Sequence, residues 1–570
     1  MAPKHLESSV PHDREGVLTN GLFPMKSSTW QLTWERWALP LLMLLATVLL
    51  LVNLGSRPLW GDEIINVIID RQDLNSVLAN LLVTAPGPTT RLVGLDVHPP
   101  FFHLIQHTWL KLAGSSELAV RLPSVVYGLI ALFLLYRIGR LIDGRATARW
   151  ALLLVAISPF WLLYARMGRY YALTAMLGLA STLLYLELLK RPTRARWAAY
   201  FLVNTAMLYT DYLVATLLIC QVVYLTWARP TRRWLVTWTA TMALVGAVYL
   251  PWFHVWLKQS AIVVNQAVVA DLSRSLVGTL LMFIFPWLSF SVGETVFPWE
   301  APAIVAGLLF VGLLLRGLAY FSKHPATVDW PGSRPAFAVL FILIPLVGTI
   351  ALLTFLAPVI PFIGISNHAF FVFPFVALLA AIGLRAIDRL GWRIAAIGLL
   401  ALAHGYSIRN YHANEHFINP VYAVPIHTVV ADVMALAQPG DAIFSDFDTG
   451  FGYYFEQMPR DGVTHYYMDN PEGLGVINDL ASDIAKRRQP RYQRVFVLIL
   501  GRDRTRRDLP AAFTQVIEPA AQLRWERGYT PQDETYRQLK RRILGREDYR
   551  FKLVVRLYEL PGQMTARAAP

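Results

Sequence analysis

The segment Pro58-Leu59-Trp60-Gly61-Asp62-Glu63 follows the first long apolar stretch of the chain, and the same polar region continues to Asp96-Val97-His98-Pro99-Pro100. Two adjacent carboxylates at the end of an apolar helix are unfavourable unless water, a cation or a chemical reaction uses them. We therefore expect Asp62 and Glu63 to lie at an active site at one end of a helical bundle.

The composition predicts a polytopic membrane protein. Of the 570 residues, 55% are hydrophobic and only 16% are charged, which is too little polar surface to cover a soluble domain. The net charge of +14 comes from basic residues dispersed among loops, so we expect contacts with membrane lipids and exclude nucleic acid as a partner. The single cysteine, Cys220, has no partner for an intrachain disulfide.

We expect an all-α bundle of about eleven transmembrane helices. One apolar window, 276–293, is interrupted by Pro286 and fits a re-entrant or partly inserted segment. Basic loops such as 190–196 and 229–233 then all lie on one side, which the positive-inside rule makes the cytoplasm. The other windows lie at 38–54, 118–142, 150–164, 170–189, 197–210, 212–228, 235–252, 300–318, 335–357, 369–387 and 393–408.

Three domains are predicted for a multi-pass protein of the cell (inner) membrane. Residues 1–35 are polar and typical of a disordered cytoplasmic tail, and residues 36–410 form the membrane bundle. Residues 411–570 form a small α/β domain outside the cytoplasm. Its pattern predicts a helix over 423–437 and strands over 441–445, 494–500 and 552–558.

The external loop between the first two spans, residues 55–117, is too long for a simple connection. Residues 63–70 and 100–112 carry apolar side chains at helical spacing, which predicts two short helices in the membrane interface. Asp62 stands directly before the first of them. Its alternative role is therefore an N-cap that accepts hydrogen bonds from free backbone N–H groups.

Arg166 and Arg169 fall at the external ends of two short apolar segments, where the positive-inside rule gives no reason for them. The planar guanidinium fork binds two phosphate oxygens at once, so these arginines fit a lipid phosphate. The alternative is that each side chain extends toward lipid headgroups.

Six short motifs occur in order along the chain: Arg57 to Glu63, Asp96 to Phe101, Ser116 to Ser124, Ser158 to Phe160, Arg169 to Leu173 and Leu250 to Trp252. In this order they resemble the bacterial membrane glycosyltransferases of the GT-C class, which are similar to protein O-mannosyltransferases and the lipid A aminoarabinose transferase. The resemblance covers roughly residues 38–410 and implies a sugar transferred from a polyprenyl-phosphate donor with inversion at the anomeric carbon.

The resemblance also implies roles for individual residues. Asp62 acts as general base on the acceptor hydroxyl, or holds that hydroxyl in line, and Glu63 orients it or binds a cation. Arg169 stabilises charge on the leaving phosphate, with Arg166 as a helper. Residues of the neighbouring motifs, Asp96, His98 and Tyr171, are expected to bind substrate.

The chain departs from the family pattern at several positions. His98 stands where the aminoarabinose branch has lysine, which argues against lipid A as acceptor, and His368 replaces a late arginine as a phosphate contact. Met167 replaces a glutamate. Asp211 occupies a position where relatives often have histidine, so it either binds substrate or ends a helix in water.

These residues predict a glycosyltransferase, of hexosyl or pentosyl type, with a protein, lipid or cell-wall glycan as acceptor. The alternative is a transporter or flippase for a polyprenyl-phosphate sugar lipid, although such a protein needs polar residues along a path through the membrane. A divalent cation is a possible cofactor, since Asp62, Glu63, Asp96 and His98 could share one. Their spacing matches no established metal site.

Overall fold

The structure, a computed structural model, describes residues 29–82, 98–266, 276–323, 365–445, 450–468, 470–501, 509–529, 538 and 552–561. The chain divides into two compact units, Met1–Leu41 and Leu42–Pro570, and the site lies in the second. The predicted span over 335–357 and the predicted substrate residue Asp96 lie outside the described residues.

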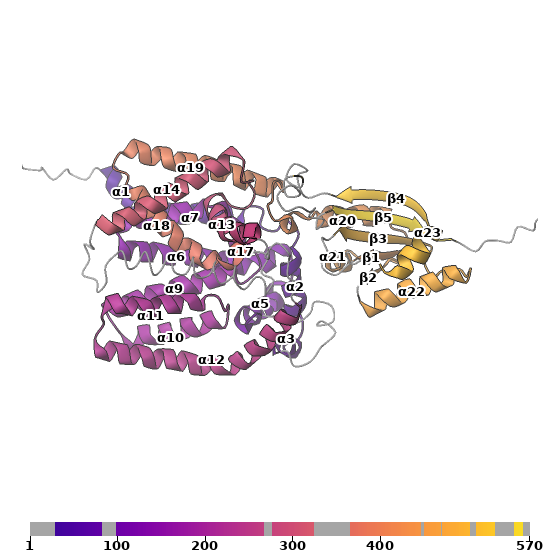
Figure 1. The fold of residues 1–570 in the computed structure, drawn as a ribbon, viewed down its shortest axis with the longest axis horizontal. Helices are drawn as coiled ribbons and strands as arrows, with labels where there is room; N and C mark the ends of the chain where they lie inside the picture. Colours follow the sequence, from indigo (N-terminus) through magenta and orange to yellow (C-terminus); the bar gives the residue numbers. More distant parts are fainter. Residues whose placement is uncertain are drawn as a thin grey trace, which may run out of the picture. The chain divides into compact units, whose positions relative to one another are not determined.

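Helices build the amino-terminal and central parts of the chain (Figure 1). Each predicted apolar window that the structure describes falls on a helix. These helices are α1 (Thr29–Leu51), α6 (Glu117–Ile142), α7 (Arg145–Ala156), α8 (Pro159–Ala165), α9 (Tyr171–Lys190), α10 (Arg194–Leu208), α11 (Ala215–Ala228), α12 (Arg232–Gln266), α13 (Leu276–Val292), α14 (Ala301–Lys323), α18 (Phe373–Arg385) and α19 (Leu390–Ala413).

The helix α1 begins earlier than expected. It starts at Thr29, within the residues 1–35 that the sequence assigns to the amino-terminal tail. The prediction for the rest of that tail lies outside the described residues.

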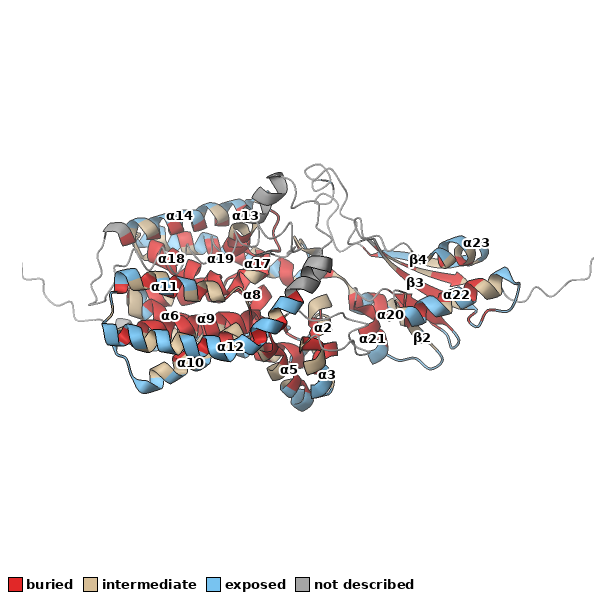
Figure 2. Cartoon of the chain, turned by 60° about the horizontal axis from the view of Figure 1, so that its bottom comes forward, coloured by how far each residue is buried: buried red, intermediate tan, exposed pale blue. Residues whose placement is uncertain are grey.

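Within the described part of the chain, four helices are long and apolar enough to cross a membrane, judged by length and composition. They are α6, α9, α12 over Arg232–Gln259 and α14 over Ala301–Phe321. The helix α12 exposes most of its surface (Figure 2), as a lipid-facing helix does. The pair α7 and α8, bent by 67°, is a fifth candidate if it forms one span, and the total of eleven stays a prediction.

The bend between α7 and α8 follows from local sequence. Ser158 caps α8, because its hydroxyl accepts a hydrogen bond from the N–H of Trp161 at 3.3 Å, and Pro159 occupies the first helical position. Gly293 lies against Pro159 with φ of +82°, where an added Cβ would stand 2.8 Å from the Pro159 Cβ. The loop after α13 therefore passes directly over the start of α8.

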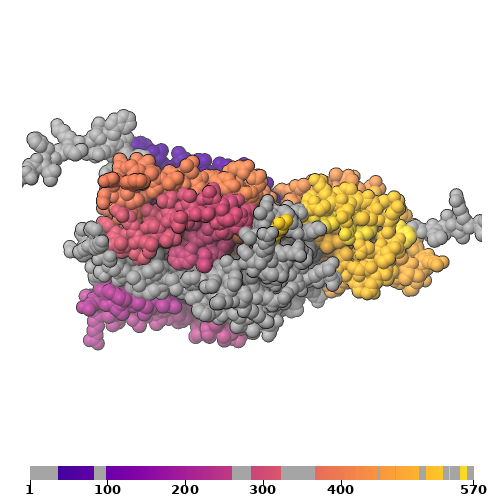
Figure 3. Space-filling model, turned by 45° about the horizontal axis from the view of Figure 1, so that its top comes forward, coloured from indigo at the N-terminus to yellow at the C-terminus, as the bar shows by residue number. Residues whose placement is uncertain are grey.

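Close helix crossings depend on small residues. An added Cβ on Gly317 of α14 would lie 2.5 Å from the carbonyl oxygen of Leu379 in α18, and one on Gly383 would lie 1.9 Å from that of Leu313. The two backbones are thus in direct contact, as small residues permit in membrane bundles. On its other side α14 packs beside α19 (Figure 3).

In the described residues between α1 and α6 there are three short helices: α2 (Gly61–Asp70), α3 (Leu74–Leu82) and α5 (Pro100–Ala113). The first and third correspond to the two predicted short helices, and α3 was not expected. Buried polar contacts join α2 to α5. The carboxylate of Asp70 lies 2.8 Å from Nδ1 of His103, and the Asp70 carbonyl oxygen lies 2.8 Å from Nδ1 of His107.

The carboxy-terminal residues form a five-stranded sheet with the order β2-β1-β3-β5-β4. The strands β1, β2 and β3 are parallel, whereas β5 is antiparallel to both β3 and β4. The three predicted strands correspond to β1, β3 and β5, while β2 and β4 were not predicted. The bounds are β1 (Ala442–Ser445), β2 (Thr464–Tyr467), β3 (Arg494–Gly501), β4 (Gln522–Tyr529) and β5 (Lys552–Glu559).

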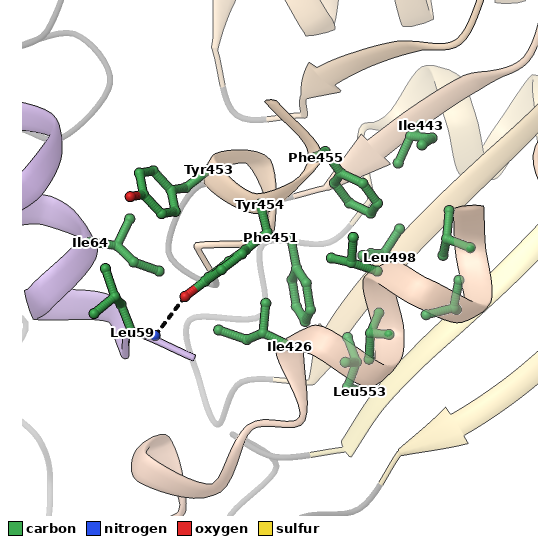
Figure 4. Close-up of a cluster of buried hydrophobic side chains, with 14 of the residues drawn as sticks. Leu59, Ile64, Ile426, Ile443, Phe451, Tyr453, Tyr454, Phe455, Leu498 and Leu553 are labelled. Carbon is green, nitrogen blue, oxygen red and sulfur yellow. Dashed lines mark hydrogen bonds between the residues drawn. The ribbon is translucent and has the colours of Figure 1, made fainter. Parts of the chain in front are cut away.

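Helices cover the two faces of this sheet. The helices α20 (Ile426–Leu436) and α21 (Phe451–Gln457) contribute to one buried cluster, and α22 (Pro471–Ala485) contributes to another. The first cluster also contains Leu59 and Ile64 from the start of the chain (Figure 4). One hydrophobic core therefore joins α2 to the carboxy-terminal region.

Candidate functional site

The helix α2 carries the two predicted carboxylates at its amino terminus. Its N-cap is Trp60, so Asp62 lies inside the first turn and the interpretation of Asp62 as N-cap is wrong. The Asp62 side chain is 42% exposed, and its Oδ2 lies 3.9 Å from Nη2 of Arg169. Asp62 is therefore a solvent-accessible carboxylate held beside a guanidinium group.

Glu63 is entirely buried and accepts four hydrogen bonds. Its Oε1 accepts from Nε of Arg121 at 3.0 Å and from the N–H of Gly168 at 2.6 Å. Its Oε2 accepts from Nη2 of Arg121 at 2.7 Å and from the N–H of Trp60 at 3.2 Å. Both carboxylate oxygens are thus engaged with protein donors.

Arg121, on the first turns of α6, uses every donor that it has. Besides its two bonds to Glu63, its Nη1 donates to the carbonyl oxygens of Leu54 at 3.0 Å and Arg57 at 2.8 Å, and its Nη2 donates to that of Pro58 at 2.8 Å. A guanidinium group has five N–H donors, so all are satisfied. Arg121 therefore fixes the path of the chain into α2.

Arg169 lies in the turn between α8 and α9 and is buried. Its Nη1 donates to Oδ1 of Asn66 and, at 3.4 Å, to the carbonyl oxygen of Asp62. The preceding residue, Gly168, packs closely on Val120, since an added Cβ at Gly168 would lie 2.5 Å from Cγ1 of Val120. The turn and α2 thus hold the Arg169 guanidinium next to Asp62.

Two tyrosines after Arg169 connect the site to α17 (Ile365–His368). The hydroxyl of Tyr171 accepts a hydrogen bond from Nδ2 of Asn367 at 2.9 Å, and the hydroxyl of Tyr170 lies 3.3 Å from Nδ1 of His368. Burial, together with the charges of His98 and Arg169, lowers the pKa of His368 to about 3. His368 is therefore neutral and offers a hydrogen bond rather than a positive charge.

His98 and Asp211 complete this side of the site. The rings of His98 and Tyr170 are 4.8 Å apart, and the N–H of Phe101 donates to the carbonyl oxygen of Tyr209 at 2.9 Å, which ties the start of α5 to the end of α10. Burial raises the pKa of Asp211 to about 6, against the opposing effects of the Leu213 N–H and His98. Asp211 is thus a buried acid near His98, and its role as a substrate contact stays a prediction.

Arg166 has different neighbours from Arg169. Its Nη2 donates to the carbonyl oxygen of Val52 at 2.6 Å, and its guanidinium lies 5.3 Å from the centre of the Tyr411 ring. Burial lowers the pKa of Arg166, and the charges of Arg121 and Arg57 act in the same direction. Tyr411 and Val52, rather than Asp62, define its place in the structure.

A buried carboxyl group that was not predicted lies behind α17. Glu294 accepts hydrogen bonds from the hydroxyl of Tyr164 at 2.8 Å and from that of Ser366, and burial raises its pKa. Ser366 directly precedes Asn367 in α17. No local pattern in the sequence relates Glu294 to its partners Tyr164 in α8 and Ser366 in α17.

The described residues contain no group of three or more His, Cys, Asp or Glu side chains that could hold a metal ion. Glu63 in particular does not fit as a ligand, since both of its oxygens accept N–H hydrogen bonds. The site that the structure does assemble contains a carboxylate, a guanidinium group, two tyrosines, two histidines and a buried aspartate.

Comparisons with known proteins indicate the fold and the family that the chain resembles. A sequence model of the family described as dolichyl-phosphate-mannose-protein mannosyltransferase matches residues 97–257, a range that includes His98, Arg169 and Asp211. The crystal structure of ArnT from Cupriavidus metallidurans bound to undecaprenyl phosphate is similar over 93% of this chain and 99% of that chain, with a TM-score of 0.51 and 14% identity. The chain has the fold of ArnT.

The apo crystal structure of ArnT gives the same result, with a TM-score of 0.51 and 13% identity over 92% of this chain and 98% of that chain. No curated protein sequence matches the chain. The resemblance to the GT-C membrane glycosyltransferases, indicated by the sequence motifs, is therefore confirmed by a family match and by the ArnT fold.

The buried ion pair gives a prediction about stability. Glu63→Gln keeps the shape of the side chain but leaves the Arg121 charge uncompensated in the interior, so the free energy of unfolding should fall by roughly 3–5 kcal/mol. Thermal melting of the purified protein in detergent measures the change. The matched control is Glu415→Gln, which removes an exposed ion pair with Arg409 and should change the stability by less than about 1 kcal/mol. Equal melting of the two variants would contradict the role assigned to Glu63.

Proposed function

We propose that the protein is an inverting glycosyltransferase that moves a sugar from a polyprenyl-phosphate donor to an extracytoplasmic acceptor. The observation that carries this proposal is the placement of the half-exposed Asp62 carboxylate 3.9 Å from the buried Arg169 guanidinium. Such a pair offers a proton acceptor for a hydroxyl group and a positive charge for a phosphate. The ArnT fold, seen elsewhere with bound undecaprenyl phosphate, supports a lipid-linked donor.

The proposed reaction is a single displacement. The acceptor hydroxyl attacks the anomeric carbon while Asp62 takes its proton, and the bond between that carbon and the phosphate oxygen breaks. The electron pair leaves with the lipid phosphate, and Arg169 stabilises the negative charge that develops there. Attack from the face opposite the leaving group inverts the configuration of the anomeric carbon.

The other residues have supporting roles in this proposal. Glu63 positions Asp62 and the turn before Arg169 through its hydrogen bonds to protein groups. Tyr171, His98 and Asp211 line the side of the site where the sugar or the acceptor binds. His368 contributes a neutral hydrogen bond near the phosphate, and Arg166 supports the site from its position under Tyr411.

The distribution of basic residues between the two ends of the helices supports an extracytoplasmic site. Arg121 lies near the start of α6, Arg169 precedes α9 and Asp211 follows α10, whereas the opposite ends of these helices carry basic residues such as Lys190 and Arg194. By the positive-inside rule the basic ends are cytoplasmic. We therefore propose a bundle of about eleven spans over residues 36–410, with a cytoplasmic N-terminus and residues 411–570 as an α/β domain outside the cytoplasm.

A flippase for a polyprenyl-phosphate sugar lipid is the second candidate function. It would use the same guanidinium groups to hold a phosphate. The arginines that could hold a phosphate lie near Asp62 at one end of the helices, however, whereas Ser181, Asn204 and Gln221, buried within α9, α10 and α11, are uncharged and bond to one another. This distribution favours transfer over transport.

Asp62→Asn tests the general base. The side chain keeps its shape and is partly exposed, so stability should stay within about 0.5 kcal/mol of the wild type. Sugar transfer from a polyprenyl-phosphate donor should fall by a factor of roughly 10²–10⁴, the usual contribution of a positioned base. Asp461→Asn, at an exposed turn of the carboxy-terminal region, is the control and should leave transfer unchanged. A stable Asp62→Asn protein with normal transfer would eliminate Asp62 as the base.

Arg169→Lys tests the phosphate contact. An ammonium group cannot reproduce the planar fork, so kcat should fall more than the affinity for the donor, because the contact strengthens as charge develops on the leaving phosphate. The readouts are kcat from initial rates and the donor Kd from direct titration. Arg409→Lys, an exposed residue, is the matched control. Equal loss of rate and affinity would indicate simple ground-state binding instead.

A further inference from the structure

The segment from Arg57 to Trp60, which leads into α2, is held at each of its residues. The carbonyl oxygens of Arg57 and Pro58 accept from Arg121, and the N–H of Trp60 donates to Glu63. The contact at Leu59 is made by a residue that is distant in sequence, Tyr454. The N–H of Leu59 donates to the hydroxyl oxygen of Tyr454 at 2.7 Å (Figure 4).

The Tyr454 hydroxyl is both a hydrogen-bond acceptor and a hydrogen-bond donor. It accepts from Leu59 and donates to Oε1 of Glu117 at 3.1 Å, while the side chain itself is buried. Glu117 is the first residue of α6, and its Oε1 also lies 3.3 Å from Nε2 of His427 in α20. A single phenol thus joins the segment before α2, the start of α6 and the helix α21.

Hydrophobic packing brings α21 against the same part of α2. Ile64 and Val67 of α2 share a buried cluster with Ile426 and Phe451. Gly450, at the N-cap of α21, has φ of +70°, and an added Cβ would stand 2.4 Å from Cδ1 of Ile64. The start of α21 therefore packs directly on the Ile64 side chain of α2, and this packing helps to fix where the Tyr454 hydroxyl lies.

We propose that Tyr454 is a positioning residue for Asp62, so that the carboxy-terminal region forms part of the catalytic apparatus. The inference rests on the proposed function of Asp62. The helix α2 carries Asp62 and also Asn66, which accepts a hydrogen bond from Arg169. A shift at Leu59 therefore displaces both the Asp62 carboxylate and the group that holds Arg169. Without the phenol oxygen, the buried N–H of Leu59 lacks its acceptor, and the segment before α2 must rearrange to find another.

Tyr454→Phe tests this proposal, with Tyr453→Phe as the matched control. Tyr453 is adjacent in α21, is equally buried, and its hydroxyl donates to the carbonyl oxygen of Ser115 at 3.2 Å rather than bonding to the segment before α2. Both variants lose one hydroxyl from the same helix. Only Tyr454→Phe removes the acceptor of Leu59.

Three readouts on the full-length protein separate positioning from general stability. Tyr454→Phe should speed hydrogen exchange of the Leu59 amide by roughly tenfold, the factor for loss of one buried hydrogen bond. It should lower kcat by roughly 10-fold to 100-fold with little change in donor KM, since small displacements of catalytic groups have effects of this size. Tyr453→Phe should give a similar shift in Tm with near-normal kcat and unchanged exchange at Leu59.

Each result of these measurements either supports or overturns the positioning role of Tyr454. Equal kcat for the two variants, or normal exchange at Leu59 in Tyr454→Phe, would overturn the proposal. If Tyr454→Phe does not fold, Glu117→Gln weakens the other bond of the phenol and should give a smaller increase in exchange at Leu59 with a smaller loss of kcat, and no change in either would overturn it. If the wild-type protein transfers no sugar, the proposed function fails, whereas the exchange measurement still tests the contact between Tyr454 and Leu59.

Discussion

A fully buried carboxylate, Glu63, meets the guanidinium group of Arg121 at 2.7 Å, and this ion pair constrains the rest of the site. Removing two charges from water is costly, and the pair is tolerated because all the donors of Arg121 are bonded and Glu63 accepts four hydrogen bonds. Those bonds extend to the segment before α2, the start of α6 and Gly168. Three segments that are distant in sequence are therefore fixed relative to one another before any substrate binds.

The ion pair also explains why two adjacent carboxylates differ in role. Successive residues of an α-helix point about 100° apart, so Glu63 faces the interior while Asp62 stays 42% exposed beside Arg169. Glu63 holds the surrounding segments in place, whereas the Asp62 carboxylate is accessible to solvent and, in the proposed reaction, to the acceptor hydroxyl. The hydrogen bond from Gly168 to Glu63 keeps the turn that carries Arg169 in the same frame.

Much of this arrangement could be predicted from the sequence, because helical windows and motifs in order are local signals. Asp62 and Arg169 were both expected at one site, and their side chains lie 3.9 Å apart. The partners that hold them were not, since the bonds of Arg121 to Glu63 and of Tyr454 to Leu59 join residues that no pattern relates. The strands β2 and β4 were missed because they lack the apolar pattern of a buried strand: β2 begins with the polar residues Thr464 and His465, and β4 exposes most of its side chains.

We propose that an acceptor hydroxyl displaces the lipid phosphate in a single step, with Asp62 as base and Arg169 at the leaving group. The stereochemistry of the product distinguishes this reaction from one with a covalent intermediate. Purified protein is incubated with a polyprenyl-phosphate sugar of known anomeric configuration and an acceptor, and the configuration of the new glycosidic bond is determined by NMR. We expect inversion. A product with retained configuration would contradict the single displacement at Asp62.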